Sequence, residues 1–173
     1  MIYNPTYYFF NRIIPETRVC NDVYFVGAEK GRLESLLDIQ KRLNEHNVTT
    51  KFHITKSKTQ VNNDYEFVQQ ISYQNIIDEI LKSRAILDYL QFGQSGMSQR
   101  VMEALCYRKK LITNDLNVVN YDFYNTNNIF IIGRDDWSNI YNFLNSPYEN
   151  IDEDIVKQYD FSAWYKRIIE GTL

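Results

Sequence analysis

The side chains best suited to chemistry lie in one short stretch near the middle of the 173-residue chain. Arg100, Glu103 and Tyr107 recur at helical spacing, which places them on one polar side of a predicted helix. One interpretation of this side is a ligand-binding surface. The alternative is a solvated face on which Arg100 and Glu103 form an ordinary ion pair, worth roughly a few tenths of a kcal/mol.

A glycine-containing loop comes directly before this helix. An apolar run over 85–89 predicts a strand, and Gly93 and Gly96 end it. Free N–H groups at a helix N-terminus, together with the helix dipole, suit a phosphate group. The predicted phosphate loop consists of Gln94, Ser95, Gly96, Met97 and Ser98. Because the apolar run 110–113 follows the helix, the stretch predicts a β-loop-α-β unit of a parallel sheet.

The residues RVMEAL at 100–105, with the turn and strand after them, resemble the R-x-x-E-A-x stretch in the C-terminal domain of GT-B glycosyltransferases. The nearest likeness is to bacterial polysaccharide-biosynthesis and spore-maturation-like members. The resemblance implies that Glu103 holds the ribose hydroxyls of a nucleoside diphosphate sugar, with Arg100 beside it, and that 94–98 lies against the phosphates. The nucleoside diphosphate sugar is then the donor substrate, and no separate cofactor is implied.

Two departures from this pattern leave the sugar and the stereochemical course open. Many retaining members carry a glutamate eight positions before Glu103, where this chain has Ser95. The glycine-proline pair often found before the helix is also replaced here. The resemblance therefore implies a donor site without implying retention or inversion of the anomeric configuration.

A second group of candidates follows the first predicted strand, over 22–26. Gly27 ends that strand, and a turn carrying Lys30 and Arg32 precedes an amphipathic helix. In GT-B enzymes this turn contacts the donor phosphates, so the resemblance implies that both cations neutralise the leaving diphosphate. The alternative for each is a solvated charge. A dinucleotide is disfavoured, because the turn lacks the full dinucleotide fingerprint.

Tyr73 is the candidate for contact with the nucleobase, because in the family the turn before the corresponding helix meets the base through its backbone. A purely structural role is the alternative. The remaining apolar patterns predict strands over 49–54, 66–72 and 129–132, a helix over 74–82, an irregular loop over 114–128, and a helix capped by Asp135 or Asp136. Together they predict one three-layer α/β/α Rossmann-like domain, 1–173, with about six parallel strands.

The two ends of the chain carry aromatic residues. Residues 1–18 predict either a crossover from an N-terminal acceptor-binding domain or an apolar cap on this domain. A final helix within 160–171 presents Phe161, Trp164 and Ile168 along one arc, which predicts firm docking on an apolar surface. The resemblance implies that an N-terminal domain or a partner chain completes the enzyme, and no catalytic base is assignable in this chain.

Composition narrows the remaining classes of function. A formal charge of −3 and a pI near 5.4 argue against a nucleic-acid partner. No apolar run approaches the ~20 residues of a membrane span, so we expect a cytoplasmic domain, either free or peripheral to the inner membrane face. The cysteines and histidines show no metal-ligand spacing, so no metal site is expected. The alternative function is a non-catalytic nucleotide or nucleotide-sugar binding module, or a subunit that completes its site with a partner.

Overall fold

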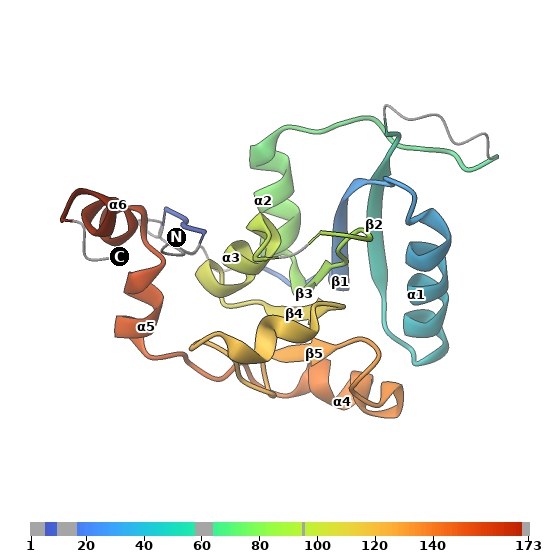
Figure 1. Cartoon of the computed structure of the whole chain (residues 1–173). Coiled ribbons are helices and arrows are strands. Elements are labelled where there is room, and N and C mark those ends of the chain that lie inside the picture. Colours follow the sequence, from blue (N-terminus) through green and yellow to red (C-terminus); the bar gives the residue numbers. More distant parts are fainter. Residues whose placement is uncertain (1–5, 10–16, 58–63, 95, 171–173) are drawn as a thin grey trace.

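Five parallel strands form the sheet at the centre of the molecule (Figure 1). The structure is a computed structural model and describes residues 6–9, 17–57, 64–94 and 96–170. The strands lie in the order β2-β1-β3-β4-β5, and every neighbouring pair is parallel. This arrangement confirms the predicted α/β class. The strands are β1 (Asn21–Ala28), β2 (Thr50–Thr55), β3 (Ser83–Asp88), β4 (Lys110–Thr113) and β5 (Ile129–Ile131).

The sixth predicted strand, over 66–72, is reduced to one parallel bridge at the edge of the sheet. Val68 pairs with Thr55 at the end of β2, and its N–H donates to the Ile54 carbonyl oxygen at 3.1 Å. The prediction of a full strand was wrong, because most of this segment is polar and exposed and has only one strand to pair with. Counting the bridge, the chain segments cross the sheet in the order 3-2-1-4-5-6, which is the order of dinucleotide-binding folds.

Helices cover both faces of the sheet, as predicted for a three-layer domain. The helices α1 (Leu33–Glu45) and α4 (Ile140–Asn145) share one apolar core, and α2 (Tyr73–Leu81) and α3 (Gln99–Cys106) share the other. Figure 1 shows α1 and α2 on opposite sides of the strands. The sheet is therefore buried on both faces, as parallel sheets require.

Alternation along β1 distributes its side chains between these two cores. Val23 and Phe25 pack with α1, whereas Tyr24 points to the other face and packs with α2 and α3. The same alternation in β3 sends Leu87 to the first core and Ile86 to the second. Strands that are apolar on both faces read as continuous runs, which is why the sequence predicted them well.

Serine side chains cap the helices that carry the candidate residues. The Ser72 hydroxyl accepts a hydrogen bond from the Asn75 N–H at 3.2 Å at the start of α2. The Ser98 hydroxyl accepts one from the Arg100 N–H at 3.0 Å at the start of α3. Such caps satisfy one of the N–H groups that a helix leaves unpaired. The first turns of both helices are therefore held in place.

The segments after β4 and β5 are short and irregular, as predicted for 114–128. A 3-10 helix, η1 (Leu116–Asn120), follows β4, and another, η2 (Trp137–Asn139), leads into α4. Of the two predicted caps, Asp136 accepts from the Ser138 N–H, so it caps η2. Asp135 instead accepts from the Ile131 N–H at 2.7 Å.

Two helices close the chain, and only the second was predicted. The acidic stretch forms α5 (Glu153–Gln158), capped by Asp152, because acidic side chains suit the positive end of a helix dipole. The final helix, α6 (Phe161–Glu170), has no buried residue among those described, and Ile169 is 63% exposed. The predicted firm docking of this helix therefore stays a prediction, because the described chain buries no residue of α6.

The contacts of α6 run mainly to the described part of the N-terminal segment. The Tyr7 and Trp164 ring centroids are 4.5 Å apart, and those of Phe9 and Phe161 are 5.1 Å apart. Figure 1 shows α5, α6 and the described residues 6–9 together at one side of the molecule. Most of the predicted crossover or cap, 1–18, lies outside the described residues. No helix in the described ranges is long and apolar enough to cross a membrane.

Candidate functional site

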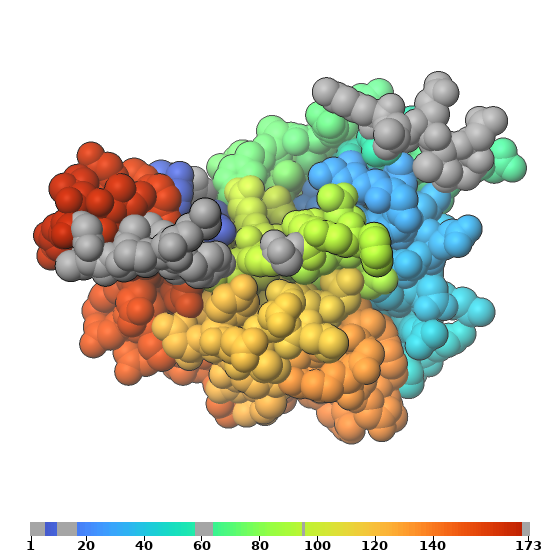
Figure 2. All heavy atoms as spheres, in the orientation of Figure 1, coloured from blue at the N-terminus to red at the C-terminus, as the bar shows by residue number. Residues whose placement is uncertain are grey.

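A cleft of about 730 Å³ opens at the carboxyl ends of β1, β3 and β4. The helices after β1 and β3 pack on opposite faces, so these neighbouring strands form the switch point at which open α/β sheets bind ligands. Figure 2 shows the loop after β3 between the turn after β1 and the segment after β4. The volume is in the range of small-molecule sites. Lining residues include Lys30, Arg32, Gln91, Phe92, Gln94 and Asn117.

Arg32 is a half-buried cation at the floor of this cleft. Its Nη1 donates to the Tyr89 carbonyl oxygen, its Nη2 donates to the Ala28 carbonyl oxygen at 3.2 Å, and its guanidinium lies 5.3 Å from the Phe25 ring centroid. A Cβ atom at Gly27 would lie 3.0 Å from Nη2, so glycine leaves room for the guanidinium. Burial lowers the pKa of Arg32. Arg32 thus joins β1 to the loop after β3, and the alternative of a solvated charge is wrong for it.

Lys30 occupies the tip of the turn in a left-handed conformation, with φ of 44°. Its side chain is exposed, lines the cleft and forms no ion pair with any residue that the structure describes. The buried Glu29 holds this turn from beneath, because it accepts hydrogen bonds from the Gly31 N–H at 2.6 Å and from the Ser57 hydroxyl. Glu29 was not predicted, since its partner Ser57 lies far along the chain.

On the other side of the sheet, Glu103 is fully buried. Its Oε2 accepts from Arg100 Nη1 and its Oε1 accepts from the Tyr73 hydroxyl at 2.9 Å. The ion pair is present, but the solvated-face interpretation was wrong, because Tyr107 is also buried. Burial raises the pKa of Glu103 to about 7, although Arg100 and Tyr73 both act to lower it.

Tyr73 begins α2 and is 38% exposed. It is therefore a partly exposed side chain in direct contact with the buried Glu103 carboxyl group. Its hydroxyl contacts Glu103 on one side and the Tyr8 hydroxyl at 2.5 Å on the other. Burial is the largest of the effects that raise the pKa of Tyr73 to about 12. The structure thus places the side chain of Tyr73, and not only its backbone, at the candidate site.

Asp88, at the carboxyl end of β3, is a buried acid that sequence reasoning did not assign to the site. It is 5% exposed, and its Oδ2 has no hydrogen-bond partner among the described residues. Burial raises its pKa to about 6, opposed by a hydrogen bond from Ser98 and by the charges of Arg32 and Arg100. Asp88 therefore couples electrostatically to both groups of candidate residues. The sequence feature that could have indicated Asp88 is an acidic residue within the apolar run 85–89, near its end.

The predicted phosphate loop divides between the cleft and the core. Gln94 lines the cleft, whereas Met97 is buried and its carbonyl oxygen accepts from the Thr6 hydroxyl at 3.3 Å. Gly96 has φ of 91°, a left-handed conformation that favours glycine. Ser98 caps α3, and Ser95 lies outside the described residues.

The candidate residues consequently form two groups, one on each side of Asp88. Lys30, Arg32 and Gln94 line the cleft, with Gly27 packed against Arg32. On the α2 and α3 side, Tyr73 and Arg100 each bond Glu103, and none of these three residues is part of the cleft lining.

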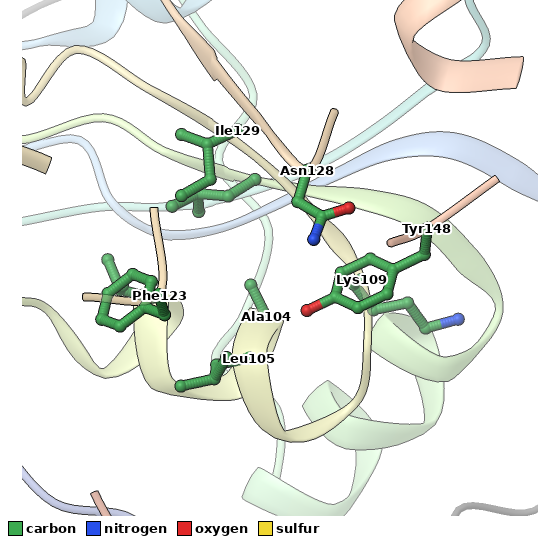
Figure 3. Close-up of a pocket in the computed structure, with 9 residues that line it drawn as sticks. Ala104, Leu105, Lys109, Phe123, Asn128, Ile129 and Tyr148 are labelled. Carbon is green, nitrogen blue, oxygen red and sulfur yellow. The ribbon is translucent and has the colours of Figure 1, made fainter. Parts of the chain in front are cut away.

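A much smaller cavity lies behind α3, between that helix and the β4–β5 region (Figure 3). It measures about 20 Å³, which is room for about one water molecule. Lys109 donates to the Leu81 carbonyl oxygen at 2.7 Å, and both ends of the Asn128 amide bond the Glu149 backbone. Burial lowers the pKa of Lys109 to about 8. These partners make the cavity a packing feature and not a ligand site.

Comparison with known proteins found no family model that matches the chain and no curated protein with significant sequence similarity to it. Within the described ranges, no group of histidine, cysteine and acidic side chains is arranged to hold a metal ion.

Proposed function

We propose that the chain is the donor-binding half of a glycosyltransferase that moves a sugar from a nucleoside diphosphate sugar in bacterial surface polysaccharide biosynthesis. The observation that carries the proposal is the cleft at the β1/β3 switch point, with an exposed lysine at its mouth and a half-buried arginine at its floor. The resemblance of 100–105 to the GT-B stretch adds the ribose ligand. The proposal also implies a cytoplasmic location, where the domain meets the membrane at most peripherally.

The diphosphate would bind in the cleft beside Lys30 and Arg32. Lys30 supplies an exposed ammonium group, while Arg32 is fixed by two carbonyl oxygens and offers a constant positive field. Charges held in place before the reaction stabilise a leaving diphosphate without a cost of reorganisation. In this scheme the chain contributes electrostatic stabilisation to the transfer and holds no assigned base.

The ribose would bind at Glu103. The carboxyl group is fully buried, and the hydroxyl on its Oε1 belongs to the partly exposed Tyr73. An ionised carboxylate can accept about four hydrogen bonds, so a ribose hydroxyl would donate to Glu103 beside the Tyr73 hydroxyl, which keeps its own hydrogen bond to Oε1. Because the pKa of Glu103 is about 7, its carboxylate form is favoured by each donor that a ligand adds.

The acceptor site would come from an N-terminal domain or a partner chain. The exposed aromatic and aliphatic side chains of Phe9, Tyr165 and Ile169 form an apolar surface of the kind that such a partner covers. This surface also suits the alternative function, in which the chain is a non-catalytic nucleotide-sugar binding module or a subunit with a shared site.

Calorimetric titration with UDP, GDP, CDP and ADP, followed by their sugars, tests the proposal. We expect one diphosphate to bind, and Lys30→Asn to weaken it more than it weakens the nucleoside. Asparagine tolerates the left-handed conformation at this position, so the substitution changes the charge with little strain. Lys41→Asn, in the exposed part of α1, is the matched control and should leave the affinity unchanged. Absence of binding by all four diphosphates would contradict the proposal.

A further inference from the structure

A line of tyrosine hydroxyl groups runs from the N-terminal segment to Glu103. The Tyr8 hydroxyl lies 2.5 Å from that of Tyr73 and 3.4 Å from that of Tyr107. Tyr73 in turn donates to Glu103 Oε1 at 2.9 Å. Tyr8 is buried, although its neighbours Tyr7 and Phe9 are exposed. One residue of this segment therefore turns inward, and it reaches the candidate ribose ligand through a single intermediary.

The direction of these hydrogen bonds follows from the number of protons. Tyr73 has one hydroxyl proton and donates it to Glu103, so its oxygen must accept the proton of Tyr8. With its own proton donated to Tyr73, the Tyr8 oxygen acts as the acceptor in its contact with the Tyr107 hydroxyl. All the hydroxyl dipoles point toward the carboxyl group, and hydrogen bonds aligned in this way polarise and strengthen one another.

The backbone of Tyr8 is held at the joint between the last two helices. Its N–H donates to the Tyr159 carbonyl oxygen at 2.9 Å, and the Phe161 N–H donates to the Tyr8 carbonyl oxygen at 3.0 Å. The Tyr159 hydroxyl donates to Asp122 Oδ1 at 2.6 Å, which ties the joint to the segment after β4. The position of the Tyr8 hydroxyl is therefore fixed by contacts with three parts of the fold.

We propose that Tyr8 is a positioning residue of the donor site, because its hydroxyl fixes the Tyr73 hydroxyl as a donor to Glu103 and so orients and stabilises the Glu103 carboxylate. The role of this carboxylate as ribose ligand rests on the proposed function. The effect of Tyr8 on Glu103 does not, since it follows from contacts within the unliganded protein.

Several charged and titratable groups act on Glu103 from the elements around it. Arg100, on the same helix, and Tyr73, on α2, favour its ionised form, whereas burial and the charge of Asp88 on β3 oppose it. Tyr24, on β1, also lies close enough to interact electrostatically with Glu103, but its hydroxyl has no hydrogen-bond partner among the described residues. Tyr24 is therefore a natural control for the loss of a nearby hydroxyl outside the chain of hydrogen bonds.

The experiment is a pH titration of the Glu103 carboxyl carbon by NMR, with Glu103→Gln to assign the signal. Each tyrosine is replaced by phenylalanine, so that only the hydroxyl is lost. Tyr73→Phe should raise the midpoint by about one pH unit, since a charged hydrogen bond is lost. Tyr8→Phe should raise it by a smaller amount, and Tyr24→Phe and Tyr7→Phe should leave it unchanged. A Tyr8→Phe midpoint equal to that of the unmodified protein, with Tyr73→Phe shifted, overturns the proposal.

The affinity for the diphosphate that binds best provides the second readout. Affinity for this diphosphate should fall as Glu103 gains a proton. In Tyr8→Phe, the acid side of the plot of affinity against pH should therefore move to higher pH by the same amount as the Glu103 titration midpoint. Affinity for inorganic pyrophosphate, which has no ribose, should not change. Equal shifts for both ligands would contradict a role through Glu103. If no nucleoside diphosphate binds, the proposed function fails, and the carboxyl titration still decides the role of Tyr8.

Discussion

Two buried carboxyl groups, Glu103 and Asp88, give the site its dependence on pH. Each has a pKa raised by burial, to about 7 and about 6 respectively. A carboxyl group whose pKa is raised on folding stays protonated in the native state after the unfolded chain has lost its proton. Native stability therefore falls as pH rises through that interval, and the loss is complete above the folded pKa. For these two carboxyl groups, the loss of native stability occurs between about pH 4 and pH 7.

Asp88→Asn tests this linkage at a single residue. The unmodified protein should lose stability between pH 4 and pH 6 as its unfolded state ionises at position 88, whereas the variant carries no such group. Above pH 6 the variant should be more stable by up to about 3 kcal/mol, the equivalent of the raised pKa. Chemical unfolding at several pH values measures how the free energy of unfolding changes with pH in each of the two proteins. Parallel slopes would show that Asp88 is not buried as an acid in the folded protein.

At the scale of elements, the side-chain amide of Asn114 fixes the loop after β3 to the end of β4. Its Oδ1 accepts from the Leu90 N–H at 2.7 Å, and its Nδ2 donates to the Leu90 carbonyl oxygen at 3.2 Å. Both backbone groups of Leu90 are thereby satisfied at the edge of the cleft. The amide holds together two of the segments that line the candidate phosphate site.

Asn114→Ala should destabilise the protein by about 1–3 kcal/mol, because the Leu90 N–H and carbonyl groups lose their partners. The amide proton of Leu90 should also exchange faster with solvent. Asn117→Ala is the matched control, since Asn117 lines the same cleft but its side chain forms none of the hydrogen bonds described above. Thermal unfolding and hydrogen exchange measure these effects. Similar losses in the two variants would mean that the loop is held in another way.

The elements themselves could largely be predicted from the sequence, because apolar periodicity marks strands and helices buried on the sheet. One prediction failed, and one helix was not predicted, where burial is slight. The segment over 66–72 forms only one bridge, and the acidic stretch forms α5 through capping and the helix dipole. Local motifs predicted Arg32 and Glu103 as candidate residues, and their roles in ligand binding stay predictions. Glu29, Asp88 and Tyr8 were missed, because their roles depend on contacts between distant parts of the chain.

At the scale of the whole molecule, the chain consists of a buried sheet unit and an exposed aromatic flank. Ile140, in α4, is fully buried, whereas Ile168 and Ile169 in α6 are 45% and 63% exposed. Apolar side chains left in water contribute little to folding and favour association with other surfaces. The flank formed by α6 and the N-terminal segment thus differs physically from the rest of the molecule.

Ile169→Lys should therefore leave the midpoint of thermal unfolding nearly unchanged and reduce self-association in light-scattering measurements. Ile140→Ala, in the core, should instead lower the free energy of unfolding by about 2–5 kcal/mol. A comparable loss of stability in Ile169→Lys would show that α6 is buried in solution, contrary to the present arrangement.

The central claim is that Glu103 binds the ribose of a nucleoside diphosphate, and a cycle of ligand and protein changes tests it most directly. Calorimetry would compare the diphosphate that binds best with its 2′,3′-dideoxy analogue, against the unmodified protein and Glu103→Gln. Loss of the ribose hydroxyls should weaken binding to the unmodified protein by about 1–3 kcal/mol, and binding to Glu103→Gln by much less. An equal loss for both proteins would show that the ribose does not contact Glu103.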